Sequence, residues 1–416
     1  MIAKLSKHTD VVTASITLPG SKSESNRLLI LQALYPGIVI ENISISDDTA
    51  VLQKALANTN TILDIHHAGT AMRFLTPYLA ATTQKEIILT GSARMQERPI
   101  GILVTALRTL GAKITYTQKE GYPPLCIAPC VLQSQVSISA NVSSQYISAL
   151  LLIAPHLEKG LLITLEGAIT SRPYIEMTLM LLKKIGVSCS FKDQVIEVLP
   201  LKSVKKSSII VEGDWSSASY YYSLVALSKN LKVRLSSFKI DSLQGDTALV
   251  LFYENLGVTT TYIDAHTILL SKNNNPLPSV FKADLTATPD LAQTIAVTCF
   301  GLAIPCHLRG LHTLKIKETD RLRALHVEFT KLGAVVYTTG EALRLEGHTI
   351  PLEKIINNPI ITTYQDHRMA MAFAPLAMLF PLTIQAPLVV AKSYPSFYKD
   401  LTKIGIETTF LESSLA

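Results

Sequence analysis

The segment from residue 18 to residue 34 combines a tight turn, hydroxyl side chains and two cations. It is LPGSKSESNRLLILQAL, in which Pro19-Gly20 precedes three serines, Lys22 and Arg27, and an apolar helical pattern follows. The first turn of a helix exposes backbone N–H groups and carries partial positive charge, which suits an anion. Lys22, Ser23 and Arg27 are therefore candidate anion ligands, although a capped surface helix with two solvated cations would have the same pattern.

Four further segments of the first half repeat this combination at expected helix starts. HAGTAMRF (residues 67–74) has a Gly-Thr turn that lets the backbone approach an anion, and RMQERPIG (residues 94–101) has two arginines before Pro99, which suits the first helical position. VSSQYISALLLIAP (residues 142–155) and SRPY (residues 171–174) supply hydroxyls and an amide. The candidate ligands are Gly69, Arg94, Arg98, Ser143, Ser144, Gln145, Ser171 and Tyr174.

Three segments of the second half bring acids and cations to expected helix starts. KIKETDRLRAL (residues 315–325) has the usual explanation of a solvated, ion-paired helix. YQDHRMAMAFAPLA (residues 364–377) sends charges into a strongly apolar helix, where they are costly unless they are used. TPDLAQTIAV (residues 288–297) begins with an acid that is either a cap or a buried acid. The candidates are Asp290, Lys317, Glu318, Arg321 and Arg368, with Lys392 after an expected apolar strand at LVVA.

The composition indicates an enzyme for small anions. The 416 residues are 48% hydrophobic and 17% charged, with a net charge of +6. No long run of Lys and Arg exists and aromatic residues are only 6%, which disfavours nucleic acid as a partner. A multiply charged, hydroxylated metabolite suits the recurring polar helix starts better.

Metal, membrane and export signals are missing from the sequence. The five cysteines form no CxxC pair and have no accompanying His/Cys pair, so neither a disulfide framework nor a zinc site is expected. The apolar segment at residues 369–384 is interrupted by two prolines and is shorter than the roughly 20 residues of a membrane span. A buried helix leading into a buried strand is expected there. No secretory signal follows Met1, so we expect a cytoplasmic protein.

A repeat organises the segments that must position these residues. A helical stretch that ends in Gly and leads into an alternating strand occurs five times, at intervals of 71 to 76 residues. The glycines are Gly111, Gly186, Gly257, Gly333 and Gly405. A degenerate sixth copy, LQKALANTNTILDI, begins at Leu52. We therefore expect six α/β modules of about 70 residues in two similar domains.

Ten motifs together resemble one family, the enolpyruvyl transferases, and within it the 5-enolpyruvylshikimate-3-phosphate synthases. In chain order they are LPGSKSxSNR, AGTAMR, ERPIG, SSQY, SRPY, EGDWSSASY, PDLAQTIA, KETDRL, DHRMAM and AKSYP. Each motif alone is weak, but all ten occur in family order and spacing from one end of the chain to nearly the other.

The resemblance implies a fold and a molecular setting. The fold is two similar α/β domains, each of three βαβαββ repeats, with the active site in the cleft between them. Domain 1 would comprise residues 1–20 and 212–416, and domain 2 residues 21–211, which would carry most contacts to shikimate 3-phosphate. Neither a metal nor an organic cofactor is implied, and the protein would be a monomer.

The resemblance also implies transfer of the enolpyruvyl group of phosphoenolpyruvate to the 5-hydroxyl of shikimate 3-phosphate, with release of phosphate. Asp290 would take the hydroxyl proton, and Glu318 and Lys22 are candidates for protonating C3 of phosphoenolpyruvate. Shikimate 3-phosphate would be bound by Lys22, Ser23, Arg27, Ser143, Ser144, Gln145, Ser171, Tyr174, Asp290 and Lys317. Phosphoenolpyruvate would be bound by Lys22, Gly69, Arg98, Gln145, Arg321, Arg368 and Lys392.

Three positions depart from the family pattern. His67 stands where the family usually has Asn, Phe74 where it often has Pro, and Thr313 where many relatives have Asn. A titratable His67 beside the expected phosphoenolpyruvate site would affect the affinity for phosphoenolpyruvate and its pH dependence.

The motifs are also compatible with two alternative functions: an enzyme that enolpyruvylates UDP-N-acetylglucosamine, and an anion-binding protein without activity. Ser23 after Lys22 argues against the first, and the intact charged residues argue against the second.

Overall fold

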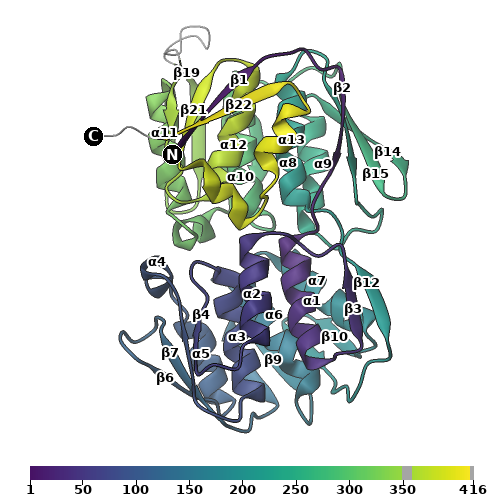
Figure 1. Cartoon of the computed structure of the whole chain (residues 1–416), viewed down its shortest axis with the longest axis vertical. Helices are drawn as coiled ribbons and strands as arrows, with labels where there is room; N and C mark the ends of the chain where they lie inside the picture. Colours follow the sequence, from purple (N-terminus) through teal and green to yellow (C-terminus); the bar gives the residue numbers. More distant parts are fainter. Residues whose placement is uncertain (349–357, 413–416) are drawn as a thin grey trace. The chain divides into compact units, whose positions relative to one another are not determined.

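The computed structural model describes residues 1–348 and 358–412 (Figure 1). The chain forms two compact units. Unit 1 contains Met1–Pro19 and Glu212–Ala416, and unit 2 contains Gly20–Val211. The described part of each unit holds three small sheets. The expected α/β class is confirmed. No helix in the described ranges is long and apolar enough to cross a membrane.

One complete repeat of unit 1 has the element order βαβαββ. It comprises β16 (Phe281–Asp284), η3 (Pro289–Leu291), α10 (Ala292–Gly301), β17 (Cys306–Arg309), η4 (His312–Ile316), α11 (Arg321–Lys331), β18 (Ala334–Thr338) and β19 (Leu343–His348). The sheet order is β16-β17-β19-β18, with the first two strands parallel and the last two forming an antiparallel hairpin.

Two N-terminal strands complete the other sheets of unit 1. β2 (Thr13–Thr17) pairs with β13 in the sheet β14-β15-β13-β2, and β1 (Ile2–Lys7) lies between β21 and β22 in the sheet β20-β21-β1-β22. The repeat that contains β2 continues through α8 (Trp215–Leu227), β13 (Lys232–Ser236), η2 (Gly245–Ala248), α9 (Leu249–Glu254), β14 (Val258–Asp264) and β15 (Thr267–Lys272). The repeat that β1 completes comprises β20 (Ile360–Ile361), α12 (His367–Phe373), η6 (Ala374–Met378), β21 (Leu382–Gln385), η7 (Pro387–Lys392), α13 (Phe397–Thr402) and β22 (Ile406–Leu411).

Unit 2 contains two complete repeats and one reduced repeat. The complete ones have the sheet orders β4-β5-β7-β6 and β10-β11-β9-β8. They comprise β4 (Ile62–Asp64), α3 (Gly69–Thr82), β5 (Ile87–Thr90), α4 (Ala93–Gln96), α5 (Gly101–Thr109), β6 (Lys113–Tyr116) and β7 (Leu125–Ala128), then β8 (Gln135–Ser139), α6 (Ser144–Ile153), η1 (Ala154–His156), β9 (Leu161–Glu166), α7 (Arg172–Lys184), β10 (Cys189–Lys192) and β11 (Val195–Val198). The reduced repeat has α1 (Lys22–Leu34), β3 (Ile38–Glu41), α2 (Asp47–Ala57) and β12 (Ser207–Ile210), with β12 parallel to β3.

The five glycines that define the sequence repeat all have positive φ, between 78° and 98°. Each ends a helix and leads into a strand at the edge of its sheet: β6, β10, β14, β18 and β22. A left-handed residue after the helix is accessible to glycine without steric cost, so this part of the repeat is confirmed. The sixth copy at Leu52 does not correspond to the other five. Its helix, α2, leads into β4, which is the first strand of the next repeat and lies at the edge of the sheet opposite to β6.

The helices that pack inside each unit explain the high apolar content. All ten residues of α10 are buried, and so is every residue of α8 except Ser216. A helix that is buried all round has protein on every side, and α10 contacts both α8 and α12 (Figure 1). In unit 2, α1, α3, α6 and α7 pack against one another in the same way. The starts of these inner helices carry most of the predicted site residues.

The apolar segment at residues 369–384 is buried in unit 1. It comprises most of α12, then η6 and the first residues of β21, and its side chains are buried except at residues 378–381. The expectation of a buried helix leading into a buried strand is confirmed.

Candidate active site

The first motif of unit 2 begins α1 as expected. Ser21 is the N-cap of the helix, and its hydroxyl accepts a hydrogen bond from the backbone N–H of Glu24 at 3.5 Å. A Cβ on Gly20 would lie 1.9 Å from the carbonyl oxygen of Asn42, so the turn needs glycine for the close approach of two backbones. This turn sets where Lys22 and Ser23 enter the first turn of α1.

Lys22 is bound to an acid that was not predicted. Its Nζ lies 3.1 Å from Oδ2 of Asp48, and Nε2 of His67 lies 3.6 Å from the other carboxylate oxygen. Asp48 stands in the first turn of α2, where an acid is favoured by the helix dipole alone. Its sequence position therefore gave no sign of a functional partner.

Arg27 is enclosed by protein groups. The guanidinium donates to the hydroxyls of Thr178 (2.8 Å) and Ser148 (3.0 Å) and to the carbonyl oxygens of Ser23 and Tyr174. The residue is 2% exposed, and burial lowers the pKa of Arg27 to about 10. The prediction that Arg27 contacts a substrate remains untested, because its observed bonds tie α1 to α6 and α7.

Two arginines converge on the start of α3. A Cβ on Gly69 would lie 2.5 Å from Nη1 of Arg98 and 3.0 Å from Nη1 of Arg73. Arg98 is 8% exposed and its buried Nε has no hydrogen-bond partner, whereas Arg94 forms an exposed ion pair with Glu97. Two cations at a helix N-terminus form a site for an anionic group.

The expectation for Pro99 is wrong. α5 begins at Gly101 with Ile100 as its N-cap, so Pro99 lies before the helix and not at its first position. Its carbonyl oxygen accepts a hydrogen bond from the hydroxyl of Tyr146 at 2.7 Å. The proline therefore fixes the loop that carries Arg98 against α6.

The polar residues of α6 and α7 lie at helix starts, as expected. Ser143 is the N-cap of α6 and accepts from the backbone N–H of Gln145, whose side chain reaches the hydroxyl of Thr70 on α3 at 3.5 Å. Ser171, at the N-cap position of α7, has φ 54° and its side chain caps no backbone N–H. Ser144 and Ser171 are buried, and Tyr174 is half-buried with its ring facing Arg27.

In unit 1 the structure brings three predicted cations around one predicted acid. Asp290 in η3 accepts from Nη1 of Arg321 at 2.8 Å and from Nη2 of Arg368 at 3.1 Å. Nζ of Lys317 lies 3.6 Å from the same carboxylate. Although burial by itself would raise the pKa of Asp290, these cations hold it well below its usual range.

Arg321 joins three carboxylates. It is 2% exposed and donates to Glu318 at 2.8 Å and to Asp366 at 2.7 Å, in addition to Asp290. Although burial opposes the charged form, these carboxylates raise the pKa of Arg321 above its usual value. The predicted residues Glu318, Arg321 and Asp290 therefore form one charged cluster, in which Asp366 is an additional member.

A strained turn places the DHR motif at the start of α12. Tyr364 and Gln365 both have positive φ (52° and 58°), which is uncommon for residues other than glycine. Asp366 follows as the N-cap and accepts from the backbone N–H of Arg368 at 2.8 Å. The turn directs Asp366 to Arg321 and lets Arg368 reach Asp290.

Lys392 lies at the end of η7, and the strand expected at LVVA is wrong. An apolar run of this length does not distinguish a strand from a buried helical turn. Nζ of Lys392 donates to the carbonyl oxygen of Gln365 at 2.9 Å, next to Asp366. Thr313 lies buried in η4, and its hydroxyl has no hydrogen-bond partner.

Asp246 is a buried acid that sequence reasoning missed. The hydroxyl of Ser216 donates to Asp246 and accepts from Nη2 of Arg368 at 3.3 Å, which links this acid to the cluster around Asp290. Burial and the nearby Asp290 raise the pKa of Asp246 to about 6. An acid inside a 3-10 turn has no sequence pattern that would have marked it.

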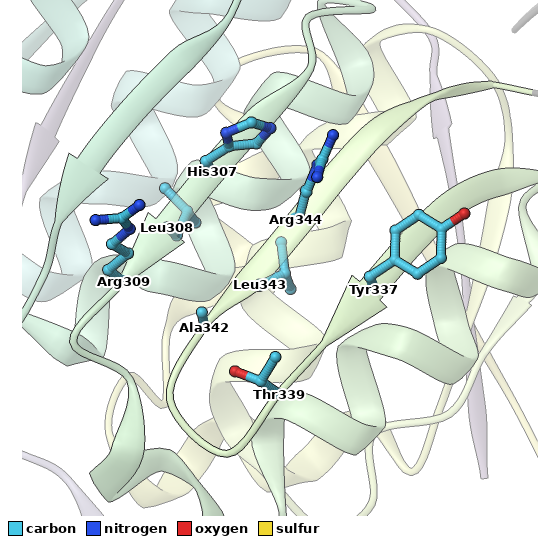
Figure 2. Close-up of a pocket in the computed structure, with 8 residues that line it drawn as sticks. All are labelled: His307, Leu308, Arg309, Tyr337, Thr339, Ala342, Leu343 and Arg344. Atoms are coloured by element: carbon cyan, nitrogen blue, oxygen red, sulfur yellow. The ribbon is translucent and has the colours of Figure 1, made fainter.

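A hollow of about 460 Å³ lies elsewhere in unit 1, on the sheet formed by β16 to β19. Figure 2 shows His307, Arg344 and Tyr337 on adjacent strands, where His307 and Tyr337 both pair with Arg344. Glu346 pairs with Arg344 and lies 3.8 Å from Nε2 of His307. None of the predicted site residues lines this hollow, so we assign no substrate to it.

The described residues offer no group of three or more His, Cys, Asp or Glu side chains arranged to hold a metal ion. The candidate site residues of both units are instead cations, hydroxyls and carboxylates paired with cations. Such groups suit the binding of phosphate and carboxylate and the movement of protons.

Comparison with known proteins gives this arrangement a family. The sequence pattern of EPSP synthase (3-phosphoshikimate 1-carboxyvinyltransferase) matches residues 51–401. The chain belongs to the EPSP synthase family. Relatives in this family include the 3-phosphoshikimate 1-carboxyvinyltransferases of Bacteroides fragilis strain YCH46, 47% identical over 95% of this chain and 96% of the relative, and of Xenorhabdus nematophila, 36% identical over 96% and 97%.

Solved structures of EPSP synthase and a related protein share the fold. EPSP synthase from Acinetobacter baumannii aligns with a TM-score of 0.76 over 98% of this chain and 100% of its own, at 19% identity. The enolpyruvyl transferase NikO from Streptomyces tendae aligns with a TM-score of 0.72 over 99% of each chain, at 15% identity. The family resemblance of the motifs is therefore confirmed, and these likenesses extend to the whole fold.

Proposed function

We propose that this chain transfers the enolpyruvyl group of phosphoenolpyruvate to the 5-hydroxyl of shikimate 3-phosphate and releases phosphate, a step of the shikimate pathway toward chorismate. The observation that carries the proposal is the convergence of Lys317, Arg321 and Arg368 on Asp290, which combines cations for an anionic substrate with an acid for proton transfer. The acceptor follows from the relatives of this chain, which are 3-phosphoshikimate 1-carboxyvinyltransferases.

The anionic groups of phosphoenolpyruvate need cations that are already oriented. Arg98 beside Gly69, together with Lys22, offers such groups in unit 2, and Arg321, Arg368 and Lys392 offer them in unit 1. Each charge-assisted hydrogen bond to a phosphate or carboxylate contributes roughly 1.5 to 3 kcal/mol. We assign these residues, with Gln145, to the donor substrate.

Shikimate 3-phosphate combines hydroxyls with a phosphate, so it needs neutral donors as well as cations. The starts of α1, α6 and α7 supply hydroxyls and exposed backbone N–H groups at the residues that the family motifs indicate. We assign to this substrate Lys22, Ser23, Arg27, Ser143, Ser144, Gln145, Ser171, Tyr174, Asp290 and Lys317.

The reaction is an addition followed by an elimination. The 5-hydroxyl oxygen forms a bond to C2 of phosphoenolpyruvate, its proton passes to Asp290, and C3 gains a proton from Lys22 or Glu318. A proton then returns from C3 to the residue that supplied it while the bond between C2 and the phosphate oxygen breaks, which restores the double bond. The departing phosphate takes up the proton held by Asp290. Carboxylates near C2 stabilise the positive charge that develops there.

Asp290 can act as a base only if its basicity rises. With three cations around it, its pKa lies too low for efficient proton abstraction near neutral pH. When the phosphate and carboxylate of phosphoenolpyruvate bind Arg321 and Arg368, they offset those positive charges. The donor substrate therefore raises the pKa of Asp290 toward its usual range before the hydroxyl reacts.

The experiment is to incubate the purified protein with phosphoenolpyruvate and one of two acceptors, and to measure phosphate release. Release with shikimate 3-phosphate and none with UDP-N-acetylglucosamine is expected. Release with the second acceptor alone would replace the proposed substrate, and release with neither would leave an anion-binding scaffold.

We also propose that the protein acts as a monomer in the cytoplasm, where both substrates are soluble anions. Sedimentation velocity on the purified chain measures the assembly state. A single species with the mass of one chain, 45.4 kDa, is expected, and a species of twice that mass would contradict the proposal.

A further inference from the structure

Asp48 interacts with two cationic or titratable side chains at the same end of unit 2. Its Oδ2 lies 3.1 Å from Nζ of Lys22, and its Oδ1 lies 3.6 Å from Nε2 of His67. The Asp48 side chain is 7% exposed, that of Lys22 15% and that of His67 35%. The carboxylate is thus held in place, while the imidazole still reaches solvent and can exchange protons with it.

His67 also stands directly before the anion site at the start of α3. Ala68 is the N-cap of that helix, and Gly69 follows with Arg98 and Arg73 against it. A positive charge on His67 therefore acts both on the Asp48 carboxylate that holds Lys22 and on the anion site at the start of α3. Asp48 is therefore the carboxylate that Lys22 and His67 both approach.

The segments around His67 carry charged residues of both signs. The charged or titratable residues near the starts of α1, α2 and α3, before α3 and in the turn before α5 are Lys22, Glu24, Asp47, Asp48, Asp64, His66, Arg73 and Arg98. Among them, Oδ1 of Asp48 lies 3.6 Å from Nε2 of His67.

On the basis of the proposed function, we propose that His67 is a positioning residue. When His67 is protonated, it shares the carboxylate of Asp48 and so releases the Lys22 ammonium to bind phosphoenolpyruvate. A single carboxylate carries one negative charge, and a second cation beside it weakens its attraction for the first. Neutral His67 leaves Asp48 paired with Lys22, so that the lysine must leave an ion pair before it can bind the substrate.

The sign of the pH effect follows from this exchange. A histidine has an ordinary pKa near 6.5, so the protonated form dominates below that value and the neutral form above it. Binding of phosphoenolpyruvate should therefore be tightest, relative to a variant without an imidazole, on the acid side of this range. The advantage should disappear as the pH rises.

The test compares wild type with His67→Asn, an amide of similar reach that does not titrate. The KM for phosphoenolpyruvate is measured at saturating shikimate 3-phosphate between pH 5.5 and 8.5, and the ratio of the variant's KM to that of wild type is taken at each pH. Ionisation of the substrate phosphate cancels in this ratio. We expect a ratio of about three or more below pH 6 that falls to about one above pH 8, with little change in kcat.

His66→Asn is the matched control. His66 is exposed, neighbours His67 in sequence, and has φ 48°, a conformation that asparagine also adopts readily. Its ratio should be independent of pH. A pH-independent ratio for His67→Asn, or the same pH dependence in both variants, overturns the proposal.

Failure of the proposed function gives a different result. If wild type releases no phosphate at any pH, the same ratio is formed from dissociation constants of phosphoenolpyruvate measured by calorimetry. A ratio that falls with pH then supports the role of His67 without the reaction. Absence of phosphoenolpyruvate binding at every pH overturns both proposals.

Discussion

Nη1 of Arg321 donates to Oδ1 of Asp290 at 2.8 Å. Asp290, the proposed general base, is therefore bound by an arginine that is only 2% exposed. The pair is not a surface ion pair that water could replace. It couples the basicity of Asp290 to whatever else binds Arg321, and the anionic donor substrate is the group proposed to do so.

Replacing Asp290 with Asn should lower kcat by about 10²- to 10⁴-fold, because the amide cannot accept the hydroxyl proton. Phosphate release at saturating substrates measures this, and circular dichroism checks the fold. Asp284→Asn in the same unit is the control, since Asp284 is an exposed side chain that accepts from Thr286. A kcat equal to that of wild type would remove Asp290 from the mechanism.

Replacing Arg321 with Gln should destabilise the protein by about 3 to 5 kcal/mol, because three partly or fully buried carboxylates lose their shared cation. Urea unfolding at pH 7.5 measures the free energy of unfolding. Arg323→Gln, an exposed position on the same helix, should change it by no more than about 0.5 kcal/mol. Equal effects of the two variants would show that the charged cluster adds no stability.

Replacing Asp246 with Asn should stabilise the protein at pH 8 and have little effect below about pH 4. Burial raises the pKa of Asp246 to about 6, against about 3.9 in an unfolded chain, so the folded state binds more protons between these values. Its contribution to stability is therefore fully present only below about pH 4 and is lost as pH rises from there through about 6. Urea unfolding should show a gain of about 2 kcal/mol at pH 8, and a loss of stability there would contradict this reasoning.

Replacing Gly69 with Ala should raise the KM for phosphoenolpyruvate by about tenfold or more, with a smaller effect on kcat. The added Cβ would lie 2.5 Å from Nη1 of Arg98, which is the far end of a flexible side chain, so the arginine moves and the fold survives. Gly101→Ala is the control, because a Cβ there meets its nearest atom at 3.4 Å. An unchanged KM in Gly69→Ala would show that this arginine does not bind the donor.

Local signals in the sequence predicted the helix starts well. Ser21, Ser143 and Asp366 are N-caps in the structure, and the repeated glycines take the left-handed conformation that their position after a helix implied. Capping and left-handed turns depend on a few neighbouring residues, so a single sequence contains the information needed to find them.

Contacts between distant residues were not predictable in the same way. β1 and β2 complete sheets whose other strands lie more than 200 residues later, and Asp48 meets Lys22 only because α2 packs against α1. Asp366 was noticed as a charge entering an apolar helix, but its bond to Arg321 depends on the strained turn at Tyr364 and Gln365. The family motifs predicted candidate site residues, and the structure adds which acid each cation meets.

Proton NMR of the product formed in D₂O from phosphoenolpyruvate and shikimate 3-phosphate tests whether the reaction runs by addition and elimination at C2. We expect one phosphate released for each new enol ether at the 5-oxygen, with deuterium in its methylene group because C3 passes through a methyl stage. Phosphate release without an enol ether, or an enol ether without deuterium at C3, would contradict it.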